Sequence, residues 1–131
     1  MPIVDGLDHL VLTVADIDRS VGFYANVLGM TAEVFYPADG STRTALKFGV
    51  QKINLHAAAT PFEPKARHPS TGSADLCFVS QAPLHVWQAH LAVHKVEVIL
   101  GPITRTGATG PLLSLYVRDP DGNLIEISNY A

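Results

Sequence analysis

The sequence predicts an α+β fold built from two tandem βαβββ modules packed side by side. Two observations carry this prediction: the order of strand-like and helix-like patterns in the first half of the chain, and the repetition of that order in the second half. The chain has 131 residues, 47% of them hydrophobic and 16% charged, so it can bury a core. We expect one domain made of module 1 at about residues 5–58, a linker at about 59–72 and module 2 at about 73–131.

The first module begins with a strand over residues 7–14, where apolar residues alternate. This alternation places His9 on the face opposite the apolar side chains. Asp16 is a typical helix N-cap, and an apolar stripe predicts a helix that ends before Gly29. Three more strands follow, at residues 31–37, 43–49 and 51–57.

The second module follows a segment, residues 58–72, whose three prolines and terminal glycine indicate a linker without regular structure. When its first strand is laid over that of module 1, Asp75 takes the position of His9. A helix is predicted from about Pro83. The remaining elements are a strand at 95–100, a glycine-containing loop at 101–111, and strands at 112–119 and 123–130.

Composition excludes several classes of protein. A net charge of -3 and a pI near 6.0 argue against nucleic-acid binding. No apolar run is long enough to cross a membrane, and the N-terminus lacks the features of a signal peptide, so we expect a cytoplasmic protein. The single cysteine, Cys77, excludes an intrachain disulfide and a multi-cysteine zinc site, and we interpret it as a small buried apolar residue.

Several stretches, spread over nearly the whole chain, resemble the vicinal oxygen chelate superfamily. They are LDHLVLTV, FYANVLGM, KFGVQKINLH, FEPKA, GSADLCF, GPITRTGATGP and LYVRDPDGNLIEISNY. This superfamily includes glyoxalase I, fosfomycin-resistance thiol transferases, extradiol dioxygenases and bleomycin-binding proteins. Within it, the chain is most similar to the short proteins called glyoxalase domain-containing protein 5 and to bacterial virulence-protein relatives. The resemblance implies a single glyoxalase-like domain with an open, curled mixed sheet and one divalent metal ion in its cleft.

The resemblance also implies two metal ligands, His9 on the first strand and Glu126 on the last. From the residues alone, a lone histidine on a strand is more often satisfied by hydrogen bonds. Glu126 stands between two isoleucines, and a buried carboxylate needs a partner, although an exposed position on an edge strand is the alternative. Glu126 is also the candidate catalytic residue, acting as a proton shuttle if substrate binding loosens it from the metal.

Three further residues are candidates for the same site. Asp75 is either a metal ligand or a hydrogen-bonding group at the start of its strand. His56 would complete a set of two histidines and one carboxylate; the alternative is a role in binding substrate. Asn54 occupies the repeat position of Glu126, where glyoxalase I often has a carboxylate. Since an amide cannot act as a base, Asn54 is interpreted as substrate-binding, which lowers the expectation of glyoxalase I activity.

Substrate binding is also predicted for Arg105, Tyr116 and Arg118. Arg105 belongs to the predicted glycine-containing loop, and a guanidinium there suits a carboxylate or phosphate; the alternative is an ordinary surface arginine. Tyr116 and Arg118 share one face of a predicted strand with Ser114, and we expect one of this set to line the cleft.

Together these features lead us to expect a divalent-metal-dependent enzyme that acts on a small substrate with vicinal oxygens. It would be an isomerase or lyase in which a Lewis acid stabilises an enediolate-like intermediate. Two alternatives stay open: a metal-free small-molecule-binding module of the bleomycin-resistance type, and an Fe(II) dioxygenase. The ion would be Zn, Ni, Mn, Co or Fe. The expected partners are a small-molecule substrate and a second copy of the chain in a homodimer, with no nucleic acid and no membrane.

Overall fold

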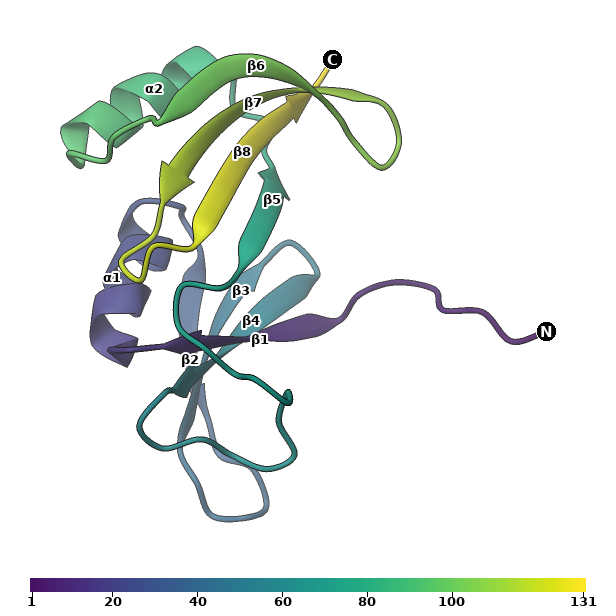
Figure 1. Cartoon of the computed structure of the whole chain (residues 1–131), viewed down its shortest axis with the longest axis vertical. Helices are drawn as coiled ribbons and strands as arrows, with labels where there is room; N and C mark the ends of the chain where they lie inside the picture. The colour runs from purple at the N-terminus through teal and green to yellow at the C-terminus, as the bar shows by residue number, and fades with distance from the viewer. The chain divides into compact units, whose positions relative to one another are not determined.

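Two four-stranded mixed sheets, each with one helix, form the structure, a computed structural model that describes all 131 residues (Figure 1). The sheets belong to two units, Met1–Thr71 and Gly72–Ala131, and each unit has the element order βαβββ. This order confirms the predicted fold class. Neither helix has the length and hydropathy needed to span a membrane.

The first unit has its strands in the spatial order β1-β4-β3-β2, with β1 parallel to β4 and the other pairs antiparallel. Its elements are β1 (His9–Val14), α1 (Ile17–Asn26), β2 (Thr31–Phe35), β3 (Arg43–Phe48) and β4 (Gln51–Ala57). The N-cap of α1 is Asp16, as predicted, and its side chain accepts a hydrogen bond from the Arg19 backbone N at 2.9 Å. No helix or strand occurs in residues 58–72, as the prolines predict.

Alternation along the strands gives this first sheet two different faces. Leu12, Ile53 and Leu55 are almost fully buried and form its core. Because side chains on a strand alternate, the intervening residues His9, Asn54 and His56 lie on the opposite face. The predicted position of His9 opposite the apolar face is therefore confirmed.

The second unit has the spatial order β5-β8-β7-β6, again with one parallel pair, β5 and β8. Its elements are β5 (Asp75–Val79), α2 (Leu84–Val93), β6 (Leu100–Thr106), β7 (Pro111–Arg118) and β8 (Leu124–Tyr130). Its core consists of Leu115, Val117, Ile125 and Ile127, with Leu84 and Leu91 of α2. Glu126, between the two isoleucines, lies on the other face of the sheet.

The predicted strand at residues 95–100 is wrong, because the strand is β6, at Leu100–Thr106. The pairing of β6 with β7 shifts register between Leu100 and Ile103, and Gly101 and Pro102 occupy this irregular position. A glycine followed by a proline resembles a loop in sequence, yet a β-bulge accommodates both. Arg105 therefore lies on a strand and not in a glycine-containing loop.

Candidate functional site

A pocket of about 370 Å³ lies on the polar face of the second sheet. It brings together the five candidates that the sequence analysis placed in module 2, which come from strands β5 to β8. Its lining residues are Asp75, Ile99, Leu100, Arg105, Tyr116, Arg118, Leu124 and Glu126. Carboxylates, guanidiniums and a phenol thus share one small concave surface, an arrangement typical of a binding site for a small polar molecule.

Within this pocket, two serine hydroxyls hold one oxygen of the Glu126 carboxylate. Ser114 Oγ donates to Glu126 Oε2 at 2.6 Å. Ser128 Oγ lies 2.6 Å from Ser114 Oγ and 3.3 Å from the same carboxylate oxygen. Both serines are fully buried and Glu126 is half-buried, so the carboxylate has a fixed orientation. Both serine contacts are to Oε2, and neither is to Oε1.

Asp75 and Glu126 are neighbours across the parallel pair β5 and β8. In this register Asp75 is opposite Leu124 and Cys77 is opposite Glu126. The two carboxylates are therefore on the same face, offset by two residues along the strands. Such diagonal neighbours lie about 7–8 Å apart at their Cα atoms, within reach of a shared small ligand.

Cys77 is exposed, so its interpretation as a buried residue is wrong. It lies on the edge strand β5, whose odd-numbered residues face away from the core. Its Sγ is 3.3 Å from Ser128 Oγ. Partial desolvation and the nearby Glu126 and Asp75 carboxylates raise the pKa of the Cys77 thiol. A thiol with a raised pKa is a poor nucleophile, which agrees with the expectation that Cys77 is not catalytic.

The DPDGN motif builds the turn that sets the position of this pocket's strands. Asp119 Oδ1 accepts hydrogen bonds from the backbone N of Asp121 and of Asn123, both at 2.9 Å. Asn123 Nδ2 donates to Asp119 Oδ2 at 2.8 Å, and Asn123 Oδ1 accepts from the Ala74 backbone N at 2.9 Å. The motif therefore connects the β7–β8 turn to the residue before Asp75, and so fixes Asp75 beside the strand of Glu126.

In the first unit, the imidazole of His9 is held by the residue before it. His9 Nδ1 lies 2.8 Å from Asp8 Oδ2, and this hydrogen bond lowers the pKa of the Asp8 carboxyl. When Nδ1 donates to a carboxylate, Nε2 carries the lone pair and is available to a ligand. Sequence reasoning did not identify Asp8, although a carboxylate next to a candidate ligand was a usable signal.

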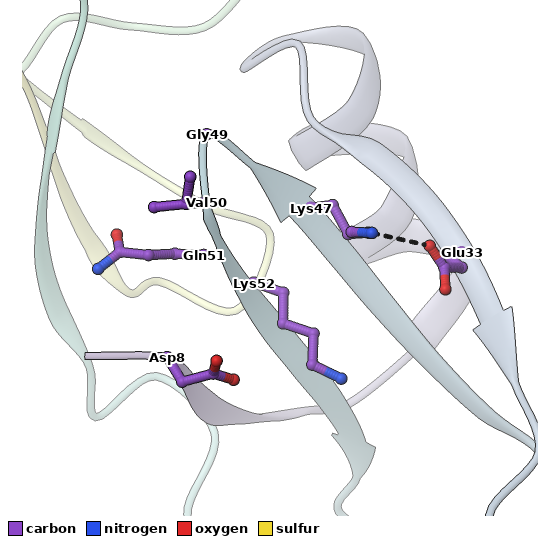
Figure 2. A pocket seen from close by; sticks show the side chains of 7 residues that line it. All are labelled: Asp8, Glu33, Lys47, Gly49, Val50, Gln51 and Lys52. Atoms are coloured by element: carbon purple, nitrogen blue, oxygen red, sulfur yellow. Dashed lines mark ion pairs between the residues drawn. The ribbon is translucent and has the colours of Figure 1, made fainter. Parts of the chain in front are cut away.

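Asp8 also lines a second pocket, of about 350 Å³, in the first unit. Figure 2 shows its lining residues, Asp8, Glu33, Lys47, Gly49, Val50, Gln51 and Lys52. Lys47 Nζ and Glu33 Oε2 form an ion pair at 3.4 Å, and Lys52 Nζ lies 4.4 Å from the centroid of the Phe35 ring. Two acidic and two basic side chains balance each other, so this pocket does not select for a charged ligand.

Asn54 and His56 lie further along the face that carries His9. His9 is paired with Lys52 and His56 with Thr13, so the two histidines are four residues apart along the strands, about 13 Å. Asn54 Oδ1 is buried without a hydrogen-bond partner. A buried acceptor of this kind is costly unless a water or ligand donates to it.

The imidazole of His56 is covered by the linker. Its ring centroid is 5.3 Å from that of Phe62, and the Arg43 guanidinium lies 4.0 Å from the centroid of the same phenyl ring. Burial, followed by the charge of Arg43, lowers the pKa of His56 below its usual value of 6.5. His56 is therefore neutral in the folded chain at neutral pH.

This lowered pKa predicts that His56 destabilises the fold in acid. Below about pH 6.5 the unfolded chain takes up a proton that the folded chain resists, so stability is fully present above that pH and is lost as the pH falls through it. His56→Gln should reduce the drop in melting temperature between about pH 7.5 and pH 5.5. The exposed His68→Gln is the control, and an equal drop in His56→Gln and wild type would contradict the prediction.

Within either unit, no three His, Cys, Asp or Glu side chains are grouped as a metal site. The candidate ligands are divided between the units: His9 in the first, Asp75 and Glu126 in the second. One imidazole nitrogen and carboxylate oxygens are nevertheless donors that suit Zn, Ni, Mn, Co or Fe.

Comparison with known proteins supports the interpretation of this fold. Residues 6–127 match the family model of the Glyoxalase/Bleomycin resistance protein/Dioxygenase superfamily. The chain is 51% identical over 128 residues to virulence protein STM3117 of Salmonella typhimurium, covering 98% of this chain and 86% of that protein. It is 53% identical over 127 residues to the glyoxalase domain-containing protein RDO1 of Mycosarcoma maydis, covering 97% and 69%.

Solved structures show the same fold. A protein from the mobile metagenome of V. Pseudocholerae has a TM-score of 0.94 and 51% identity, covering 100% of this chain and 98% of that one. Two more distant structures share the fold at lower identity. Lactoylglutathione lyase of Agrobacterium tumefaciens has a TM-score of 0.69 and 22% identity, covering 97% and 95% of the two chains. TnmS3, an antibiotic-binding protein of Streptomyces sp. CB03234, has a TM-score of 0.76 and 18% identity, covering all of both chains.

Proposed function

Because the chain belongs to the Glyoxalase/Bleomycin resistance protein/Dioxygenase superfamily, we propose that it is a divalent-metal-dependent enzyme acting on a small substrate with vicinal oxygens. The reaction would be of the isomerase or lyase type. The observation that carries this proposal is the pocket in which Glu126, oriented by Ser114, lies beside Asp75 and Tyr116.

The proposed metal ligands are His9 and Glu126, with Asp75 as the preferred third. Asp75 lines the same pocket as Glu126, whereas His56 is about 13 Å from His9 along the strands and is covered by Phe62. The register therefore favours Asp75 over His56. It also weakens the Fe(II) dioxygenase alternative, which needs both histidines on one ion.

A bound divalent ion would supply a Lewis acid that stabilises negative charge on the substrate oxygens. Glu126 is the proposed proton shuttle, acting if substrate binding loosens its carboxylate from the ion. Ser114 would keep the carboxylate oriented through Oε2, and Oε1 would then take a proton from a substrate carbon and return it to the neighbouring one. Asn54, whose Oδ1 has no partner, is proposed to accept a hydrogen bond from a substrate hydroxyl. Arg105, Tyr116 and Arg118 are proposed to bind the rest of the substrate.

One observation favours a second candidate, a metal-free binding module of the bleomycin-resistance type. Neither unit by itself brings together three His, Cys, Asp or Glu side chains that could bind one metal ion. Such a module would use the same pocket to bind a small molecule without chemistry.

Hydrogen exchange separates the two candidates. The chain, reconstituted in turn with Zn, Ni, Mn, Co and Fe(II), is incubated with dihydroxyacetone in D₂O and followed by NMR. If Glu126 moves protons between adjacent carbons, deuterium enters the substrate with wild type and at a rate reduced by about 100-fold or more with Glu126→Gln. Binding without exchange at any metal, or equal exchange by Glu126→Gln, would contradict the enzymatic proposal.

The homodimer implied by the family resemblance is also part of the proposal. Residues before β1 leave the first sheet as an extended arm (Figure 1), and Ile3, Val4 and Leu7 on it are 77%, 90% and 59% exposed. Apolar side chains clustered on such an arm are suited to packing against a second copy. Light scattering should give twice the chain mass of 14.0 kDa, and a mass of 14.0 kDa would contradict the dimer.

A further inference from the structure

We infer that the pocket of the second unit binds an anionic group, a carboxylate or a phosphate, at the guanidinium of Arg105. The inference rests on the proposed function and adds a substrate class to it. The substrate would carry vicinal oxygens at one end and an anionic group at the other.

The first observation is that the pocket holds two guanidiniums without an anionic partner. Arg105 and Arg118 both line it, and neither forms an ion pair with a carboxylate. Arg43 in the first unit differs, because its Nη2 lies 3.1 Å from Asp39 Oδ2. Arg118 is exposed, whereas Arg105 is half-buried, and a half-buried cation without a counter-charge is a favourable site for an anionic ligand.

The second observation is that Tyr116 fixes the orientation of Arg105. Arg105 Nε donates to Tyr116 Oη at 2.9 Å, and the guanidinium carbon lies 5.4 Å from the centroid of the tyrosine ring. Both terminal nitrogens of Arg105 are left without a partner in the unit. A planar guanidinium held in this way can bind both oxygens of a carboxylate or phosphate at once. Arg118 is less available, since its Nη1 donates to the Gly122 carbonyl at 3.2 Å.

The third observation is the position of Arg105 relative to Glu126. Tyr116 on β7 is directly opposite Glu126 on β8, and Arg105 reaches Tyr116 from β6 on the other side. Arg105 is opposite Leu112, four residues along β7 from Tyr116, so its side chain extends along the sheet to reach the Tyr116 hydroxyl. Arg105 and Glu126 line the same pocket of about 370 Å³, so one small molecule can contact both. The carboxylates of Glu126 and Asp75 repel an anion, so the anionic group is directed to the Arg105 end.

The inference is tested by NMR titration of the full, metal-free, ¹⁵N-labelled chain with two matched pairs of probes. Dihydroxyacetone phosphate is compared with dihydroxyacetone, and 2-oxoglutarate with 2-oxobutyrate. Within each pair the vicinal oxygens are the same and only the distal anionic group differs. In at least one pair we expect the member with the distal anionic group to bind about 10- to 100-fold more tightly, which is the range for a hydrogen bond to a charged group. The pair that shows the preference tells whether the anionic group bound at Arg105 is a phosphate or a carboxylate.

Variants test whether Arg105 causes the preference for the distal anionic group. Arg105→Met should abolish it, Arg105→Lys should retain part of it, and Tyr116→Phe should reduce it because the anchoring hydroxyl is lost. Lys95→Met, which removes a positive charge from the same unit outside the pocket, should leave it unchanged. The inference is overturned if neither pair shows a preference, if Arg105→Met keeps it, or if Lys95→Met loses it equally.

The metal-free chain is used so that this result is independent of the proposed reaction. If the protein never binds metal but prefers the probes with a distal anionic group through Arg105, the enzymatic proposal is contradicted and the anionic-group site is supported. If the protein binds metal but shows no such preference, the anionic-group site is contradicted and the metal site is supported. Circular dichroism of Arg105→Met and the result with Arg105→Lys exclude misfolding as the cause of a loss.

Discussion

Replacing Glu126 with glutamine is expected to weaken binding of the divalent ion by at least about 100-fold. Loss of a residue that only hydrogen-bonds to a metal ligand typically lowers metal affinity about 10- to 100-fold, and loss of the ligand itself should cost more. The amide is neutral, and its size allows Ser114 to keep its hydrogen bond, so the change removes charge more than shape. Competition with a chelating dye measures the affinity.

Glu97→Gln is the matched control, because Glu97 is an exposed glutamate of the same unit that does not line the pocket. Its metal affinity should equal that of wild type. Wild-type affinity in Glu126→Gln would show that Glu126 is not a ligand.

The second large effect is expected on stability. Gly101→Ala should lower the free energy of unfolding by about 3 kcal/mol or more. Gly101 has a φ of 109°, and a Cβ at this position would lie 2.3 Å from the Ser114 backbone oxygen and 3.1 Å from Leu115 Cα. Because these are backbone atoms, neither can move aside without displacing β7, the strand that carries Ser114 and Tyr116. Urea denaturation followed by circular dichroism measures the loss.

Gly22→Ala is the control for this experiment. Gly22 lies in the interior of α1, has no atom within 4 Å of an added Cβ, and should gain about 0.5–1 kcal/mol because alanine favours the helix. If Gly101→Ala is as stable as wild type, the close approach of β6 to β7 at this glycine is not rigid.

Much of the fold could be predicted because the period of the apolar residues is clear. Alternation identified seven of the eight strands, and the N-cap Asp16 marked the start of α1. Strand β6 was misplaced, since Gly101 and Pro102 interrupt its pattern and a bulge accommodates them. A bulge depends on the partner strand, here β7, and leaves no local signal distinct from that of a loop.

The candidate site could be predicted in part for a related reason. Asp75 was named from the internal repeat, and Glu126 and Tyr116 from the family resemblance and strand parity; the structure places all three in one pocket. Cys77 was interpreted as buried because no adjacent base in the sequence marked it as a nucleophile, but an edge strand exposes it. The hydroxyl of Ser114 on the Glu126 carboxylate is a contact between β7 and β8, and only the strand register reveals it.

Metal content shows whether His9 and Glu126 bind a divalent ion. The tag-free chain, His9→Ala and Glu126→Gln are purified in parallel and measured by inductively coupled plasma mass spectrometry. We expect close to one equivalent of a divalent metal in wild type and a loss of that metal in both variants. No metal in wild type even after reconstitution, or full metal content in both variants, would contradict it.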